Sequence, residues 1–179
     1  MNRCSWCNID NPIYIDYHDN EWGKLNTDDK YLFEMLILES FQAGLSWECI
    51  LNKRDDFRDC YDNFDINKIV LYDENKINEL LQNEKIIRNR LKIKYSIENA
   101  KIFKSITSKY GSFYNYLCSF SKGKIIYENN KTTNRLSDLI SSDLYKMGMR
   151  YVGSTIIYSY LQAIGIINSH EKCCYLYKK

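Results

Sequence analysis

The sequence is 179 residues long, 45% hydrophobic, and carries a formal net charge of +2. That length is sufficient for one hydrophobic core and predicts a single globular unit. No apolar run approaches the roughly 20 residues that a membrane-spanning helix requires, and Met1 to Ser5 do not form the charged-then-apolar start of a secretory leader. Because seven cysteines cannot all pair with one another, we expect a cytoplasmic protein whose thiols are free or bound to a metal.

Charge is divided unevenly along the chain. Residues 1–84 contain 8 Lys and Arg against 18 Asp and Glu, a net of −10, whereas residues 85–179 contain 17 against 5, a net of +12. A basic half is typical of a surface that contacts a polyanion such as DNA. The alternative is that these charges only keep a folded protein soluble.

The composition predicts an all-α fold. The chain has one proline, seven glycines and only two valines, and its apolar residues recur at helical spacing. Residues that form N-caps mark several helix starts. In the first half, the predicted helices run from Thr27 to about Ala43, from Ser46 through Leu51, from Asp65 to Val70, and from Asp73 to Leu81.

The second half contains the longer predicted helices. Between Asn89 and Lys109 the apolar residues form one stripe, with basic residues that include Lys92 and Lys94 around it. The segment from Ser121 to Asn134 is polar and without periodicity, and it is the predicted loop. Two more helices are predicted, from Leu136 to Met147 and from Ser154 to Ile167.

Both histidines lie near the ends of the chain and beside cysteines. His170 and Cys174 have the His-x3-Cys spacing that can present two side chains to one zinc ion. At the front, three pairs can complete a tetrahedron: Cys4 with His18, which we favour, Cys7 with His18, or Cys4 with Cys7. The alternative is that these cysteines are small buried apolar groups and the histidines ordinary polar residues.

A turn with glycine at both ends, residues 148–153, separates the last two predicted helices. It leads directly into a helix N-terminus, where free backbone N–H groups can hold a phosphate oxygen. Lys146 and Arg150 add positive charge at the same place. Most such turns only connect helices, but this one lies in the basic half, which favours contact with a DNA backbone.

Glu39 is a carboxylate on an apolar helix face. It follows Leu32, Met35 and Leu36 by seven, four and three residues, so it points to the interior, where an ionised carboxylate is costly unless paired. It either has a structural role, capping a helix or pairing with an arginine, or lines a ligand pocket. Nearby aromatic residues favour a pocket for a flat, positively charged ring. They are Trp6, Tyr14, Tyr17, Trp22 and Trp47.

Five segments of the chain resemble the DNA-3-methyladenine glycosylase I family. They are Arg3–Trp6, Tyr14–Gly23, Leu38–Trp47, Ile86–Arg90 and Tyr151–Thr155, in the order found in that family and across nearly the whole chain. The two long segments are highly specific to it. The resemblance implies an all-helical fold of the helix-hairpin-helix DNA glycosylase superfamily, with a structural zinc ion joining the N- and C-terminal segments.

The resemblance also implies site residues. The zinc ligands are Cys4, His18, His170 and Cys174, although Cys173 is a rival to Cys174. Glu39 is the catalytic residue, accepting hydrogen bonds from the base and offsetting its charge, while Tyr17 and Trp47 stack on the ring. Trp6 and Tyr14 complete the base pocket. The DNA-binding residues are Gly44 and Leu45, which approach the gap in the duplex, and Arg150, Gly153, Ser154 and Thr155 of the hairpin.

The implied reaction is hydrolysis of the N-glycosidic bond of 3-methyladenine in alkylated double-stranded DNA, after the base has been flipped out. Thr155 stands two residues after the final glycine of the hairpin, where bifunctional relatives have a Schiff-base lysine, so strand cleavage is not expected. Residues 154–170 also lack the aspartate that many superfamily members use. Leu91 stands where family members commonly have glycine.

These expectations describe one glycosylase domain, residues 1–179, that acts as a monomer. The hairpin lies at about 136–167, and residues 1–23 and 168–179 form a zinc-bound subdomain. The competing hypothesis is a zinc-stabilised helical protein that binds damaged DNA without catalysis. Glu39 separates the two, because a protein that only binds DNA has no need of a carboxylate on an apolar face.

Overall fold

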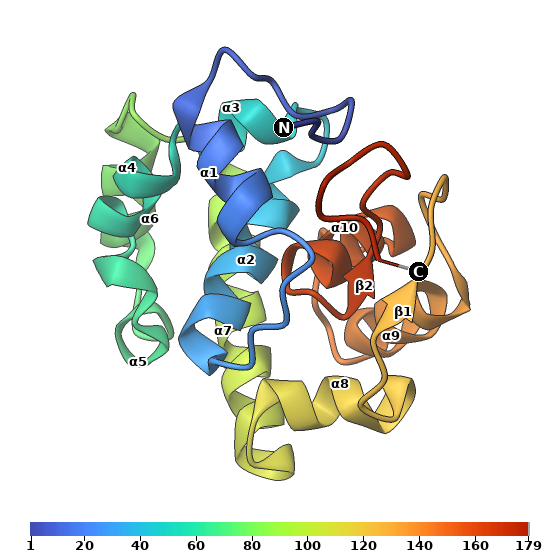
Figure 1. Cartoon of the computed structure of the whole chain (residues 1–179). Helices are drawn as coiled ribbons and strands as arrows, with labels where there is room; N and C mark the ends of the chain where they lie inside the picture. The colour runs from blue at the N-terminus through green and yellow to red at the C-terminus, as the bar shows by residue number, and fades with distance from the viewer. Residues whose placement is uncertain (179) are drawn as a thin grey trace.

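The computed structural model describes residues 1–178, and these are mostly helical (Figure 1). The helices are α1 (Pro12–Asn20), α2 (Asp29–Gln42), α3 (Trp47–Leu51), α4 (Arg54–Cys60), the 3-10 helix η1 (Asp62–Phe64), α5 (Ile66–Ile69), α6 (Glu74–Gln82), α7 (Arg90–Tyr110), α8 (Phe113–Ser121), α9 (Arg135–Lys146) and α10 (Ser154–Ala163). Two short strands, β1 (Ile126–Tyr127) and β2 (Ile167–Asn168), pair in parallel.

Side-chain caps begin most of the helices that the sequence predicts. Asp28 caps α2, Ser46 caps α3, and Asn89 caps α7, each accepting a hydrogen bond from a backbone N–H of the first turn. Asp65 and Asp73 do the same for α5 and α6. Because each cap satisfies an N–H group that has no partner within the helix, these starts are fixed by local sequence.

Three α-helices, the 3-10 helix η1 and the strand pair were not predicted. Helix α1 starts at the Asn11 cap with Pro12 in its first turn, and α4 and α8 complete the additional set. The segment Ser121–Asn134, predicted as loop, contains the last residue of α8 and strand β1. In a mostly helical molecule the two-residue strands serve to attach this segment to Ile167 and Asn168.

Helix α10 ends four residues before the predicted Ile167. Gly165 adopts φ +79°, and a Cβ built there would lie 2.2 Å from the carbonyl carbon of Lys24. Glycine is therefore required both by its left-handed backbone and by the close approach of another segment. The chain leaves the helix at this point and continues into β2.

Helix α2 is the centre of the core. All ten residues from Leu32 to Phe41 are buried, and the helix packs against α3, α7, α8 and α10. A helix buried on every side carries any polar residue into the interior. The buried apolar side chains form one continuous cluster, from Cys4 near the N-terminus to Cys174 near the C-terminus.

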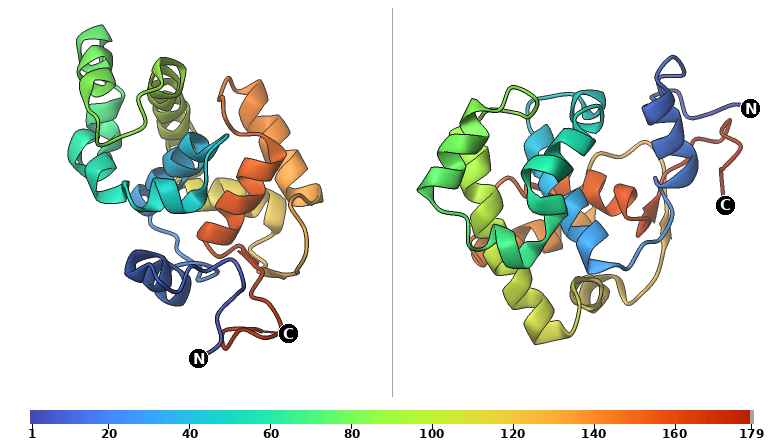
Figure 2. Two further views of the ribbon diagram at one scale, coloured as in Figure 1. Left: turned by 90° about the horizontal axis from the view of Figure 1, so that it is seen from above. Right: turned by 90° about the vertical axis from the view of Figure 1, so that its left-hand side faces the viewer.

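The two ends of the described chain lie side by side, as the left view of Figure 2 shows. The backbone N–H of Tyr175 donates to the carbonyl of Asn2 at 2.9 Å. None of the helices in residues 1–178 combines the length and the apolar composition of a membrane-spanning helix.

Candidate active site and metal cluster

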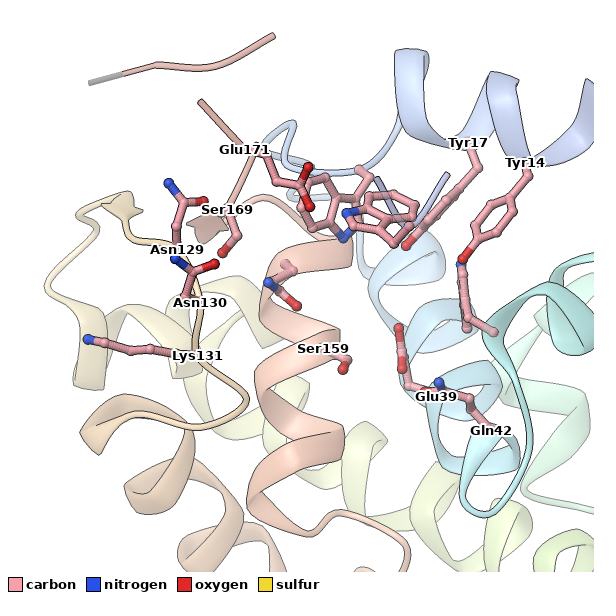
Figure 3. Close-up of a pocket in the computed structure, with 14 residues that line it drawn as sticks. Tyr14, Tyr17, Glu39, Gln42, Asn129, Asn130, Lys131, Ser159, Ser169 and Glu171 are labelled. Carbon is pink, nitrogen blue, oxygen red and sulfur yellow. The ribbon is translucent and has the colours of Figure 1, made fainter. Parts of the chain in front are cut away.

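A pocket of about 390 Å³ opens between α1, the α2–α3 region and α10. Figure 3 shows Tyr14, Tyr17, Glu39 and Gln42 on one side of the Ser159-bearing helix α10 and the segment Asn129–Lys131 on the other. The five residues predicted for the base pocket all line it: Trp6, Tyr14, Tyr17, Glu39 and Trp47.

Glu39 is the buried acid of this pocket. Its side chain is 3% exposed, and Oε2 has no hydrogen-bond partner. Burial raises the pKa of its carboxyl to about 8, because the charged form loses water. Within residues 1–178 Glu39 makes no ion pair, so pairing with an arginine does not explain its position. An unpartnered acceptor that faces a pocket is suited to a ligand that donates hydrogen bonds or carries positive charge.

Aromatic rings form most of the wall around this acid. The ring centroids of Tyr17 and Trp47 are 5.3 Å apart, and Trp6 lies 5.5 Å from Tyr14 and 4.6 Å from Trp22. Tyr17 comes from α1, the helix that the sequence did not predict, and Trp47 begins α3. Such a wall favours a flat ligand, which can stack on the ring faces.

Trp22, a member of the aromatic set that the sequence placed near Glu39, also lines the pocket. The rest of the lining was not predicted, and it comprises Gln42, Asn129, Asn130, Lys131, Ser159, Gln162, Ser169 and Glu171. Gln42 lies in a segment that carries the family resemblance, so a signal for it existed. The others are at least 87 positions away from Gln42 in the chain, and no local pattern links them to Glu39.

Four residues from the two ends of the chain form the metal cluster, defined as Cys4, His18, His170 and Cys174. All four are buried, and one ligand atom of each lies within 4.8 Å of the others. Nδ1 of His170 is 3.5 Å from Sγ of Cys4 and 3.6 Å from Sγ of Cys174. Nε2 of His18 lies 3.5 Å from Sγ of Cys174. This set can hold a metal ion.

Neighbouring groups orient the ligands of the metal cluster. Nδ1 of His18 lies 2.8 Å from the carboxylate of Asp19, which Arg3 also binds, so Nε2 is left to face the cluster. The backbone N–H of Glu171 donates to Sγ of Cys4. Carboxylates behind histidine ligands and N–H groups directed at cysteine sulfur are frequent around protein-bound metals.

The other candidate cysteines lie outside this set. Sγ of Cys7 is 3.8 Å from the carbonyl of Tyr14 and donates toward it. Cys173 is exposed, whereas its neighbour Cys174 is 5% exposed and belongs to the cluster. Of the pairs that the sequence left open at the front, the structure brings together Cys4 and His18.

Helices α9 and α10 pack against each other and are joined by the α9–α10 turn, residues 147–153. Asn99 of α7 holds this turn, since its side chain accepts from the backbone N–H of Arg150 and donates to the Arg150 carbonyl. The guanidinium of Arg150 lies 4.4 Å from the centre of the Tyr145 ring. Tyr145 is 59% exposed, so this pair forms part of the surface beside the turn.

The start of α10 has no side-chain cap. Its N-cap is Gly153, and among helices of eight or more residues in 1–178 it is the one without such a bond. First-turn N–H groups therefore remain for an outside acceptor. The hydroxyl of Ser154, however, already donates to Asp138 of α9. Ser154 can therefore offer only its backbone N–H to such an acceptor, while its hydroxyl links α10 to α9.

A second exposed feature is the 43–46 loop, which joins the Glu39-bearing helix to the Trp47-bearing helix. Gly44 has φ +81° with nothing within 4 Å of the position that a Cβ would take, and Leu45 is 40% exposed. An exposed apolar tip at the edge of the pocket suits insertion between stacked bases.

Comparisons with known proteins place these features in context. The family model described as methyladenine glycosylase matches residues 6–177. The chain is 40% identical to DNA-3-methyladenine glycosylase 1 of Escherichia coli (strain K12), over 98% of this chain and 97% of that protein.

Two solved structures are similar over the full length. A crystal structure of 3-methyladenine DNA glycosylase I has a TM-score of 0.94 at 39% identity, covering 99% of this chain and 100% of that one. A variant of 3-methyladenine DNA glycosylase I, solved in complex with 3-methyladenine, has a TM-score of 0.94 at 30% identity, covering 100% and 99%. The likeness includes the segments that build the pocket and the metal cluster.

Proposed function

The chain belongs to the methyladenine glycosylase family of enzymes, and on that premise we propose that it removes 3-methyladenine from alkylated double-stranded DNA by hydrolysing the N-glycosidic bond. The observation that carries this proposal is Glu39, a buried carboxylate with a free oxygen in an aromatic pocket. Methylation at N3 makes the adenine cationic, which weakens its glycosidic bond and makes the base a fitting partner for an acid.

The pocket residues divide into two roles. Tyr17 and Trp47 hold the flipped ring by stacking and cation–π attraction, and stacking offsets part of the few kcal/mol that flipping costs. The cationic base lowers the raised pKa of Glu39, so the carboxyl loses its proton when the base enters, accepts hydrogen bonds from the base and offsets its charge. Trp6 and Tyr14 complete the wall. In a cavity of about 390 Å³ a purine fits with room for its sugar.

The DNA-binding surface in this proposal comprises the 43–46 loop and the α9–α10 turn. Gly44 and Leu45 occupy the gap left by the base, while Gly153, Ser154 and Thr155 present backbone N–H groups to a phosphate. Arg150 adds positive charge. Thr155 is not an amine nucleophile, so the enzyme releases the base without cleaving the strand.

We propose zinc as the ion of the metal cluster. Tetrahedral zinc with bonds of about 2.3 Å to sulfur and 2.05 Å to nitrogen places sulfur and nitrogen ligands about 3.6 Å apart. The sulfur–nitrogen distances of 3.5 and 3.6 Å in the cluster agree with that value. Burial raises the pKa of Cys4 to about 12, so a buried thiolate needs a cation beside it. Four protein ligands leave no position for a catalytic water, which makes the role structural.

The family likeness covers nearly the whole chain, and we propose that residues 1–179 act as one glycosylase domain and as a monomer. One continuous hydrophobic core supports this proposal. The hairpin comprises α9, the α9–α10 turn and α10, and residues 1–23 and 168–179 form the zinc-bound part.

Release of the base from methylated duplex DNA tests the proposal. Purified protein should free 3-methyladenine, and treatment of the reaction with borohydride should trap no covalent protein–DNA adduct. The competing hypothesis of a protein that binds lesions without catalysis gains support if the duplex is bound and no base is released at any enzyme concentration.

A further inference from the structure

Lys92 is a buried lysine without an acidic partner. Its side chain is 8% exposed, although the sequence placed it on the basic outer side of α7. No ion pair within residues 1–178 includes it, and burial lowers the pKa of its ammonium group. A buried charge is costly unless other groups satisfy it, so the contacts of Nζ explain its position.

The ammonium group binds the end of α2. Nζ donates to the carbonyl of Phe41 at 2.8 Å and to the carbonyl of Ala43 at 2.5 Å. Helix α2 has no basic residue in its own last turn. A positive charge at a helix C-terminus interacts favourably with the carbonyl dipoles, so Lys92 of α7 supplies the cap that α2 lacks.

Helix α7 does not explain this lysine. Lys92 lies in the first turn of α7, three residues after the Asn89 cap, where the helix dipole disfavours a positive charge. Its backbone N–H donates to Asn89, but many residues can make that bond. The favourable interactions of the side chain are therefore with other parts of the molecule.

The same ammonium group faces the hairpin. It lies 5.9 Å from the ring centre of Tyr151, within the α9–α10 turn. Tyr151 has φ +57°, a backbone conformation that costs energy for a residue other than glycine, and Tyr95 packs against its ring. Lys92 thus contacts both segments that approach DNA: the start of the 43–46 loop and the α9–α10 turn.

We propose that Lys92 is a positioning residue that fixes the spacing between the 43–46 loop and the α9–α10 turn, so that both engage one damaged duplex together. The proposal rests on the proposed function, because the spacing matters only when DNA is the substrate. Lys92 does not line the pocket. It acts through the Phe41 and Ala43 carbonyls and the Tyr151 ring.

Three variants distinguish a positioning role of Lys92 from a direct charge effect on DNA and from a general effect on protein stability. Lys92→Met keeps the length of the side chain and removes the ammonium group, and Lys92→Arg restores a cation that can donate to two carbonyls. The matched control is Lys94→Met, the same substitution two residues along α7 at an exposed position.

Two binding measurements form the test. One is the affinity for a duplex that contains a stable abasic-site analogue, measured by anisotropy at several salt concentrations. The other is the affinity for free 3-methyladenine, measured by tryptophan fluorescence. We expect Lys92→Met to weaken duplex binding about tenfold, with no change in the salt slope, which is the dependence of the logarithm of affinity on the logarithm of salt concentration. Its affinity for the free base should stay within about twofold of the wild type. Lys92→Arg should recover most of the lost duplex affinity. Lys94→Met should keep the free-base affinity of the wild type and, at most, lower the salt slope.

Three results overturn the proposal. Equal losses of duplex and free-base affinity in Lys92→Met would indicate a general loosening of the fold. A salt slope smaller by about one would indicate that Lys92 contacts a phosphate directly. Failure of Lys92→Arg to recover duplex binding would show that the positive charge at residue 92 is not what positions the two segments. If Lys92→Met does not fold, Tyr151→Leu is measured in the same way, since it removes the ring and leaves both carbonyl bonds. Failure of the wild type to release 3-methyladenine overturns the proposed reaction alone, because duplex binding is measured without chemistry.

Discussion

The indole of Trp22 lies edge-on against the imidazole of His170, with ring centroids 4.7 Å apart and an angle of 89° between the planes. Trp22 lines the pocket, and His170 belongs to the metal cluster. Trp6, whose ring centre is 4.6 Å from that of Trp22, packs against His18 at 5.3 Å. The pocket wall therefore rests directly on two of the four proposed metal ligands.

Cys174→Ser should lower thermal stability far more than Cys173→Ser, because Cys174 is in the metal cluster and Cys173 is exposed. We expect a fall in Tm of about 10 °C or more for the first variant and about 1 °C or less for the second. Metal analysis should find about one zinc ion per chain in the wild type and in Cys173→Ser. A Cys174→Ser protein that keeps its Tm and loses only base release would mean that the metal is catalytic.

Glu39→Gln should lower the rate of 3-methyladenine release by about 100-fold or more, since glutamine offsets no positive charge. The substitution keeps the shape of the side chain, so the fold should be unaffected. The matched control is Glu34→Gln, because Glu34 is a buried acid of the same helix that binds Arg54 and does not line the pocket. Glu34→Gln should lower stability and retain the rate per folded molecule. Equal rates for wild type and Glu39→Gln would contradict the assignment.

Stability should fall as the pH rises because of Glu39. Its pKa is about 8 in the folded protein against 4.5 ordinarily, so the folded state holds the proton more tightly than the unfolded state. The resulting stability is fully present below pH 4.5 and is lost as the pH rises through about 8. Urea unfolding of wild type and Glu39→Gln at pH 5, 7 and 9 checks this. The free energy of unfolding of the wild type should decline relative to the variant, and parallel curves would show that Glu39 is ionised throughout.

Gly165→Ala and Gly44→Ala form a matched pair with nearly equal φ, +79° and +81°. Both variants bear the left-handed strain of about 1–2 kcal/mol. Only at Gly165 does the new Cβ meet backbone, at 2.2 Å from Lys24, whereas Gly44 has open space around it. Chemical unfolding should therefore show a much larger loss of stability for Gly165→Ala. Comparable losses for the two variants would indicate that the Lys24 segment moves away at little cost.

Local sequence was sufficient for the features that depend on caps and periodicity. The starts of α2, α3 and α7 follow from Asp28, Ser46 and Asn89, because a cap acts within three residues. The burial of Glu39 followed from its helix face. The set of Cys4, His18, His170 and Cys174 came from the family resemblance and not from local sequence, and the structure brings these four side chains together.

Features that depend on contacts between distant segments were not predictable. Arg54 and Glu34 form a buried ion pair, but from the sequence alone they are two ordinary surface charges. Lys92 is buried as well, although the sequence assigns it to a basic outer face. The end of α10 depends on the position of Lys24, about 140 residues earlier in the chain. Leu91, where the family commonly has glycine, is 57% exposed in a regular first turn of α7, so the substitution requires no change of backbone.

The meeting of the two chain ends has a consequence for synthesis. Residues 6–22 leave the ribosome well before His170, yet Trp22 packs against His170, and Trp6 packs against His18 beside it. A nascent chain can form its central helices early, because domains gain structure as they are made. Its pocket wall, however, stays without support until residues 170–174 are free, so a translation product that stops short of them should be helical and unable to recognise a damaged base.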